Sequence, residues 1–139
     1  MSAFVVQRLE RGPDAARAAR QAVRDLCGNR LAAEFVTDVE LVVSELVTNA
    51  VTHGAGQVTL TVTLANGRVT LSVMDEGGGR PRLRHVEDGS GHGRGLALVV
   101  RIAHEWQVRE APQGVGKEVW CVLSGAAAGR GQQPVDAVG

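Results

Sequence analysis

Residues 40–54 read Glu-Leu-Val-Val-Ser-Glu-Leu-Val-Thr-Asn-Ala-Val-Thr-His-Gly, and this stretch decides the fold. Thr37 and Glu40 offer a capping box at the start of a helix, and Gly54 offers a stop at its end. Between these signals, apolar residues recur at helical spacing, which predicts a long amphipathic helix with one stripe facing the core. That stripe comprises Val39, Val42, Val43, Leu46, Val47, Ala50 and Val51.

A polar row follows the same helix, because Glu45, Asn49 and His53 are spaced four residues apart. At ~100° per residue, residues four apart share one side of a helix, and this row lies at the border of the apolar stripe. The side chains are therefore expected to be half-buried at the wall of any adjacent cavity. Taken alone, the row is equally compatible with a polar flank that has no function.

The composition limits the class of protein. A chain of 139 residues with 44% apolar content predicts one folded domain. Fifteen basic and fifteen acidic residues cancel, so no overall field draws the chain to nucleic acid or to an anionic membrane. The sequence has neither a membrane-spanning apolar run nor a signal-peptide pattern, which favours the cytoplasm. Cys27 and Cys121 lack metal-ligand spacing and are expected to be packing residues.

The other segments predict a sheet with one further helix. Val58, Leu60, Val62 and Leu64 alternate with threonines, and Asn66-Gly67 is a strong hairpin signal. The arginines of the first helix (Arg17, Arg20 and Arg24) form a basic face, which indicates a solvated surface or, less directly, a partner surface. The expected elements are strands at 3–10, 57–64, 69–75, 106–110 and 115–123, a helix at 15–26, and a disordered tail at 125–139.

A carboxylate ends the third of these strands. Asp75 has the parity of the inward-facing residues before it, and Gly77, Gly78 and Gly79 follow closely. One interpretation is an Asp that simply begins a flexible turn. The other is an inward carboxylate that accepts a hydrogen bond from a buried ligand, with glycines that let the ligand approach the backbone.

A glycine-rich segment, Gly89-Ser-Gly-His-Gly-Arg-Gly95, leads into an expected helix at 96–103. Free amides at a helix N-terminus suit a phosphate group. The segment is not a dinucleotide-binding fingerprint, because a charged loop at 80–88 separates it from the preceding strand. It is not a Walker A motif, because no Gly-Lys-Ser/Thr occurs. Alone, it is also compatible with a flexible loop.

Together and in this order, these segments resemble the GHKL ATPase superfamily, and within it the small anti-sigma-factor serine/threonine kinases. Residues 45–53 look like the N box, Asp75-x-Gly-x-Gly79 like the first glycine box, and Gly91-x-Gly-x-Gly-Leu96 like the second. Gly116-Lys117-x-Val-Trp120 resembles the closing strand motif. The resemblance implies an α/β two-layer sandwich, with a mixed, mostly antiparallel sheet and helices on one face, over residues 1–124.

The resemblance also implies roles for individual residues. Asn49 would hold a magnesium ion that bridges the phosphates of ATP, and Glu45 would act as general base or orient the attacking hydroxyl. Asp75 would accept a hydrogen bond from the adenine amino group, with Gly77 and Gly79 against the base. The second glycine box would line the phosphates, and its candidate binding residues are Gly91, Gly93, Arg94, Gly95 and Leu96. His53 is expected to be structural.

The implied function is an ATP- and magnesium-dependent protein serine/threonine kinase that regulates a sigma factor. Such a protein would phosphorylate a small anti-sigma antagonist, bind the sigma factor and form a homodimer, without contacting nucleic acid or membrane directly. Two alternatives remain open. One is a non-catalytic ATP-binding module that docks a partner, and the other is an ATP-binding domain that serves a histidine phosphorelay.

Overall fold

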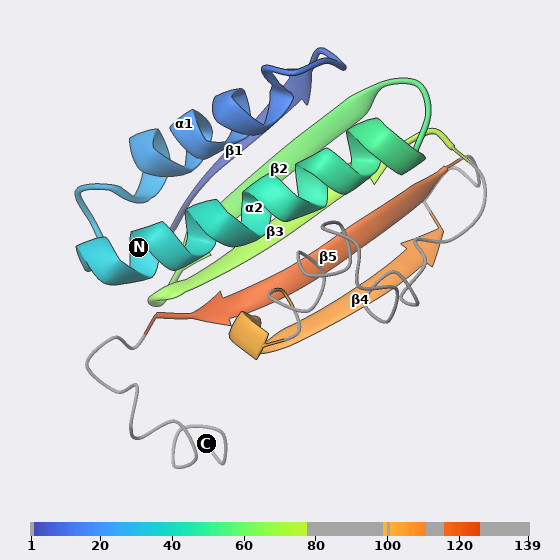
Figure 1. Ribbon diagram of the computed structural model, residues 1–139. Helices are drawn as coiled ribbons and strands as arrows, with labels where there is room; N and C mark the ends of the chain where they lie inside the picture. The colour runs from blue at the N-terminus through green and yellow to red at the C-terminus, as the bar shows by residue number, and fades with distance from the viewer. Residues whose placement is uncertain (1, 78–98, 100, 111–115, 126–139) are drawn as a thin grey trace.

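The computed structural model describes residues 2–77, 99, 101–110 and 116–125 of the chain. Two helices, α1 (Ala15–Cys27) and α2 (Ala33–His53), lie on one face of a five-stranded sheet (Figure 1). The strands are β1 (Ser2–Leu9), β2 (Val58–Ala65), β3 (Arg68–Asp75), β4 (Glu105–Glu110) and β5 (Lys117–Ser124). The chain thus forms the expected α/β two-layer sandwich.

Helix α2 carries the predicted stripe into the core. Its stripe residues are buried, apart from Val51, which is partly exposed near the end of the helix. Gly54 ends α2 as predicted, and its amide donates to the carbonyl oxygen of Ala50 at 3.0 Å. The C-terminal end of a long, well-packed helix therefore has a fixed position above the sheet.

The predicted capping box of α2 is wrong. The helix begins at Ala33, a full turn before Thr37, and Ala32 is its N-cap. The hydroxyl of Thr37 donates to the carbonyl oxygen of Ala33 at 3.1 Å, so it lies inside the helix. Phe35 and Val36 are buried in the extra turn. Apolar packing of that turn outweighs the local capping signal.

Two arginines of α1 turn toward α2. Nη1 of Arg20 donates to Oγ of Ser44 at 2.8 Å, and Nη1 of Arg24 lies 2.8 Å from Oε1 of Glu40. Arg17 pairs with Asp14 within the first turn region of α1. The basic face predicted for this helix is therefore largely engaged in contacts within the chain.

The hairpin between β2 and β3 forms at the predicted turn. Asn66 and Gly67 have φ values of +53° and +75°, the left-handed pair that a two-residue hairpin needs. The register places Val62 opposite Leu71 and Leu64 opposite Val69. The alternating apolar residues of both strands are buried, as the sequence predicts.

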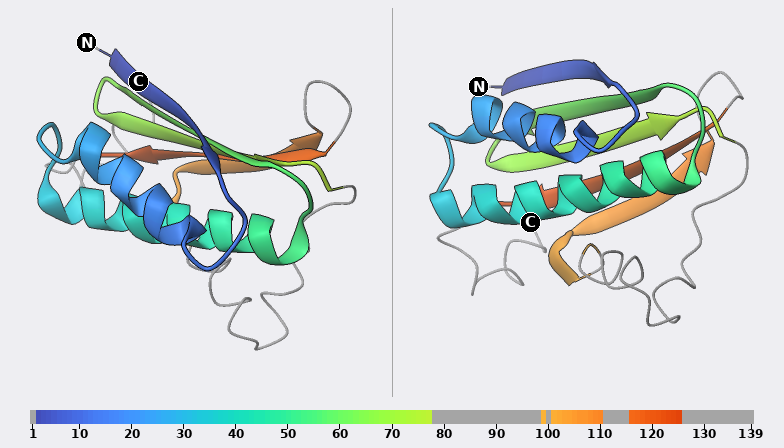
Figure 2. Two further views of the ribbon diagram at one scale, coloured as in Figure 1. Left: turned by 90° about the horizontal axis from the view of Figure 1, so that it is seen from above. Right: turned by 45° about the horizontal axis from the view of Figure 1, so that its top comes forward.

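The sheet order is β1-β2-β3-β5-β4, and every pairing is antiparallel. The expected mixed sheet is thus fully antiparallel within the described residues. Figure 2 shows both helices on the same side of the sheet. On the opposite face, Phe4 and Val6 of the edge strand β1 remain 68% and 57% exposed. Within the described residues, no helix is long and apolar enough to cross a membrane.

Candidate functional site

The polar row of α2 lies where the sequence places it, at the border of the core. Glu45 and Asn49 are both partly buried, one turn apart. His53 differs from the expectation, because it is exposed at the last position of the helix. The side chains of Glu45 and Asn49 are therefore partly open to solvent.

Asp75 ends β3 with its side chain on the helical face, and it is 4% exposed. Its Oδ1 accepts hydrogen bonds from the amide of Gly77 at 2.7 Å and from the amide of Ala55 at 3.4 Å. The ammonium of Lys117 lies 3.0 Å from the same oxygen. The inward carboxylate predicted from strand parity is therefore present, and it is fixed by donors from three segments.

Lys117 is one of the site residues whose role the sequence predictions missed. It opens β5 directly opposite Asp75 in the register, and it is 6% exposed. A buried lysine requires a negative partner, because desolvation of a lone ammonium is costly. Strand parity could have found it, since Lys117 is in phase with the inward-facing Val119 and Cys121 of β5.

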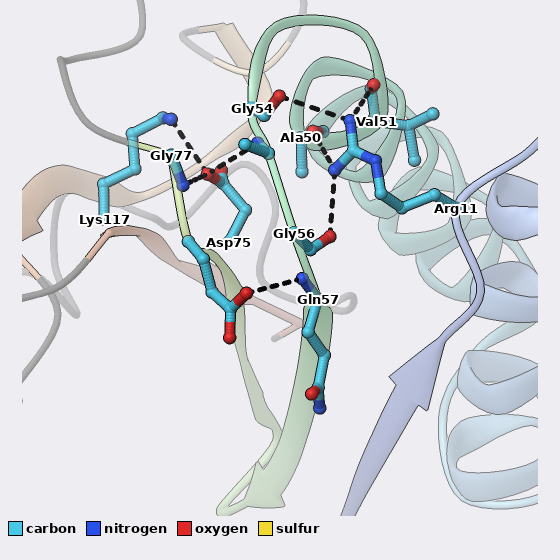
Figure 3. Close-up of polar contacts among 11 residues, drawn as sticks. Arg11, Ala50, Val51, Gly54, Gly56, Gln57, Asp75, Gly77 and Lys117 are labelled. Carbon is cyan, nitrogen blue, oxygen red and sulfur yellow. Dashed lines mark hydrogen bonds and ion pairs between the residues drawn. The ribbon is translucent and has the colours of Figure 1, made fainter.

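The end of β3 is joined to the loop that follows α2 (Figure 3). The amide of Glu76 donates to the carbonyl oxygen of Ala55 at 2.8 Å, and Oε1 of Glu76 accepts from the amide of Gln57 at 3.1 Å. These contacts fix the position of Asp75 relative to the helix that carries Glu45 and Asn49.

Glycines surround Asp75 because side chains have no room there. A Cβ atom at Gly54 would lie 2.5 Å from Cγ of Asp75, and one at Gly77 would lie 3.1 Å from its Oδ1. Gly116 has a φ of +87°, and a Cβ atom there would overlap the carbonyl oxygen of Asp75. Of these glycines, the sequence prediction assigned only Gly77 to the site.

Arg11 holds the C-terminal end of α2 in place, and its role was not predicted. Its guanidinium donates to the carbonyl oxygens of Ala50 and Gly56 at 3.2 Å each, and to that of Gly54 at 3.3 Å. It also donates to the carbonyl oxygen of Val51. The α2 C-terminus carries partial negative charge, which favours a cation there. Figure 3 shows the guanidinium reaching across from the segment after β1.

Several predicted site residues lie outside the described residues. They are Gly79 of the first glycine box and Gly91, Gly93, Arg94, Gly95 and Leu96 of the second. The charged loop at 80–88 and most of the predicted helix at 96–103 also lie outside them. Asp75 and Gly77 lie together at the end of β3. Glu45 and Asn49 lie on α2, the helix that ends at His53, next to Gly54.

Both thiols are buried, and burial disfavours their thiolate forms. Burial raises the pKa of Cys121 to about 12, and burial likewise raises the pKa of Cys27. Neither cysteine forms a disulfide. A thiolate is needed for nucleophilic attack, so the thiols serve packing, as the sequence predicts.

The residues present fit a magnesium ion that is held mainly by phosphate. Within the described ranges, no cluster of three or more His, Cys, Asp or Glu residues could enclose a metal. Mg²⁺ commonly uses one or two protein oxygens and completes its shell with phosphates and water. The half-buried amide of Asn49 offers one oxygen of that kind, while Glu45, one turn away, is expected to act on the attacking hydroxyl.

The sequence matches the Histidine kinase-like ATPase domain family over residues 9–123. The chain therefore belongs to this family, and the resemblance to GHKL ATPases is confirmed. The class of fold implies ATP as the ligand. No curated protein matches the sequence.

Two solved structures share the fold. One contains the RsbU and RsbW domains of Rv1364c from Mycobacterium tuberculosis, with 22% identity, a TM-score of 0.66 and coverage of 88% of this chain. The other is the histidine kinase domain of a blue-light activated histidine kinase, EL346, from Erythrobacter litoralis, with 22% identity, a TM-score of 0.55 and coverage of 81%. This chain spans 32% of the first protein and 60% of the second.

Proposed function

We propose that this chain is an ATP- and magnesium-dependent protein serine/threonine kinase that acts as an anti-sigma-factor regulator. The observation that carries the proposal is Asp75, a buried carboxylate with all its described donors on Oδ1. Among the described residues no donor reaches its Oδ2, which we propose accepts a hydrogen bond from the amino group of adenine. Family membership and the partial burial of Glu45 and Asn49 support the same function.

Each of the proposed site residues has a separate role in phosphoryl transfer. Asp75 orients the base, and Gly77 and Gly79 let it approach the backbone. Asn49 would hold the magnesium ion, which would supply positive charge to the phosphates of ATP. The phosphates would be contacted by residues of the second glycine box, namely Gly91, Gly93, Arg94, Gly95 and Leu96. Glu45 accepts the proton of the attacking serine hydroxyl, so that the products are ADP and a phosphoserine.

The substrate is proposed to be a small anti-sigma antagonist protein, and the sigma factor is proposed to bind the same kinase. We further propose a homodimer in the cytoplasm, without direct binding to nucleic acid or membrane. Residues 1–124 would form the kinase domain, and residues 125–139 a tail without a role in catalysis.

Glu45→Ala tests the catalytic part of this proposal. A kinase loses phosphoryl transfer in this variant and keeps ATP binding, because the general base acts after the nucleotide binds. A non-catalytic binding module shows no transfer in either form. Matched measurements are calorimetric ATP binding and transfer of labelled phosphate to candidate antagonists. An acid-labile phosphoryl product would indicate phosphohistidine and would favour the phosphorelay alternative.

A further inference from the structure

The buried pair of Asp75 and Lys117 retains unused hydrogen-bonding capacity. A lysine ammonium has three N–H donors, and a carboxylate oxygen accepts through more than one lone pair. Within the described residues, Lys117 donates to Oδ1 of Asp75, and no described donor reaches Oδ2. The side chains are only 8% and 3% exposed. Buried polar groups are normally satisfied, so a donor and an acceptor that have no further partner among the described residues are candidates for contact with a ligand.

The position of the pair suits a flat ligand at the end of the sheet. Asp75 is the last residue of β3, and Lys117 is the first residue of β5. The two residues are directly paired across the strands, with both side chains on the face that carries the helices. Figure 3 shows Lys117, Asp75 and Gly77 converging at this end. The adjoining glycines, Gly54 and Gly77, lie so close to Asp75 that a side chain at either position would collide with its carboxylate.

We propose that Lys117 and Asp75 together recognise the adenine base of ATP through hydrogen bonds. The ammonium of Lys117 donates to the ring nitrogen N1 of adenine, while Oδ2 of Asp75 accepts from the neighbouring 6-amino group. The Watson–Crick edge of adenine presents this donor beside this acceptor, which matches the acceptor and donor of the pair. The inference rests on the proposed function, because it names the residue that completes recognition of ATP.

A purely structural ion pair gives a different result from a base-reading pair. If Lys117 only neutralises Asp75, its replacement changes the stability of the fold and weakens all purine nucleotides alike. If Lys117 donates to N1 of adenine, its replacement makes the binding affinity independent of whether the nucleotide has a nitrogen at that position. A hydrogen bond from a charged donor in a buried site is worth roughly ten- to a hundredfold in affinity. Nucleotides altered at N1 therefore separate the two roles.

The experiment compares ATP with 1-deaza-ATP, in which N1 is replaced by a C–H group, by calorimetry in the presence of magnesium. Wild type is expected to bind 1-deaza-ATP roughly ten- to a hundredfold more weakly than ATP. Lys117→Met is expected to bind the two within about twofold of each other. The control ligand is 7-deaza-ATP, whose change lies away from this edge, so its affinity relative to ATP is expected to be the same in both proteins.

Lys117→Gln provides a second variant that keeps a neutral donor. It is expected to show an intermediate preference for ATP over 1-deaza-ATP, because a neutral hydrogen bond is weaker than a charged one. It also reports on the proposal if Lys117→Met does not fold. Equal binding of ATP and 1-deaza-ATP by wild type overturns the inference alone, as does a preference that survives in both variants. Failure of wild type to bind ATP overturns the proposed function and this inference together.

Discussion

Nη1 of Arg11 lies 3.2 Å from the carbonyl oxygen of Ala50, which is 39 residues further along the chain. Through this contact and its neighbours, the segment before α1 closes the exposed end of α2. The last carbonyls of a helix have no partner within the helix, and Arg11 supplies one. The same end leads into Gly54 and Ala55, which border Asp75.

Replacement of Arg11 by Met is therefore expected to destabilise the protein by about 1–2 kcal/mol, since several carbonyls lose a charged donor at an exposed site. The measurement is the free energy of unfolding in urea. Arg8→Met is the matched control, because Arg8 is also an exposed arginine and lies on β1. Equal unfolding free energies for the two variants would mean that Arg11 does not hold the end of α2.

Leu46→Ala tests whether α2 is the central packing element. Leu46 is buried within the core, and its truncation leaves a cavity that is expected to cost about 2–5 kcal/mol. The control in the same helix is Leu41→Ala, because Leu41 is 44% exposed and its loss is expected to cost about 0.5 kcal/mol or less. Chemical denaturation measures both, and similar costs would contradict the burial pattern of α2.

The turn at Gly67 offers a test of backbone conformation alone. Gly67 has a φ of +75°, and a Cβ atom there would meet no other atom within 4 Å. Gly67→Val is expected to destabilise the hairpin by about 1–2 kcal/mol, because a β-branched residue resists the left-handed region. Gly67→Asn is expected to cost less, since Asn tolerates that region. Equal costs in urea unfolding would argue against a left-handed turn.

The pKa of Cys121 makes a prediction about alkaline stability. The thiol titrates at about 12 in the folded protein, against an ordinary value of 9.0, because burial disfavours the thiolate. Below about pH 9 the thiol is protonated in both the folded and the unfolded protein, and its contribution to the free energy of unfolding is fully present. As the pH rises from about 9 to about 12, this contribution is lost, and the free energy of unfolding falls by no more than about 1.4 kcal/mol per pH unit. Cys121→Ala is expected to flatten this fall in unfolding free energy above pH 9. An unchanged slope in the variant would show that other groups cause it.

Much of the fold was predictable because its signals are local and regular. The stripe from Val39 to Ala50 determines α2, and Asn66-Gly67 determines the hairpin. Strand parity placed Asp75 on the inner face correctly. Each of these features depends on residues that are close in the sequence, where periodicity and turn preference act directly.

The missed features depend on contacts between distant segments. Arg11 meets the end of α2 across a wide sequence separation, and Lys117 meets Asp75 through the pairing of β3 with β5. The register that brings Lys117 opposite Asp75 is not encoded in either strand alone. The start of α2 was misplaced for a related reason, because burial of Phe35 decides it and the local cap does not.

The central claim is that Asp75 belongs to a nucleotide site, and calorimetry of magnesium-ATP binding tests it most directly. Wild type is expected to bind ATP, and Asp75→Asn and Asn49→Ala are each expected to bind it at least about tenfold more weakly. Asp25→Asn is the control, because it removes one negative charge just as Asp75→Asn does, but at an exposed position on α1. ATP binding that is absent in wild type, or unchanged in a folded Asp75→Asn variant, would contradict the account.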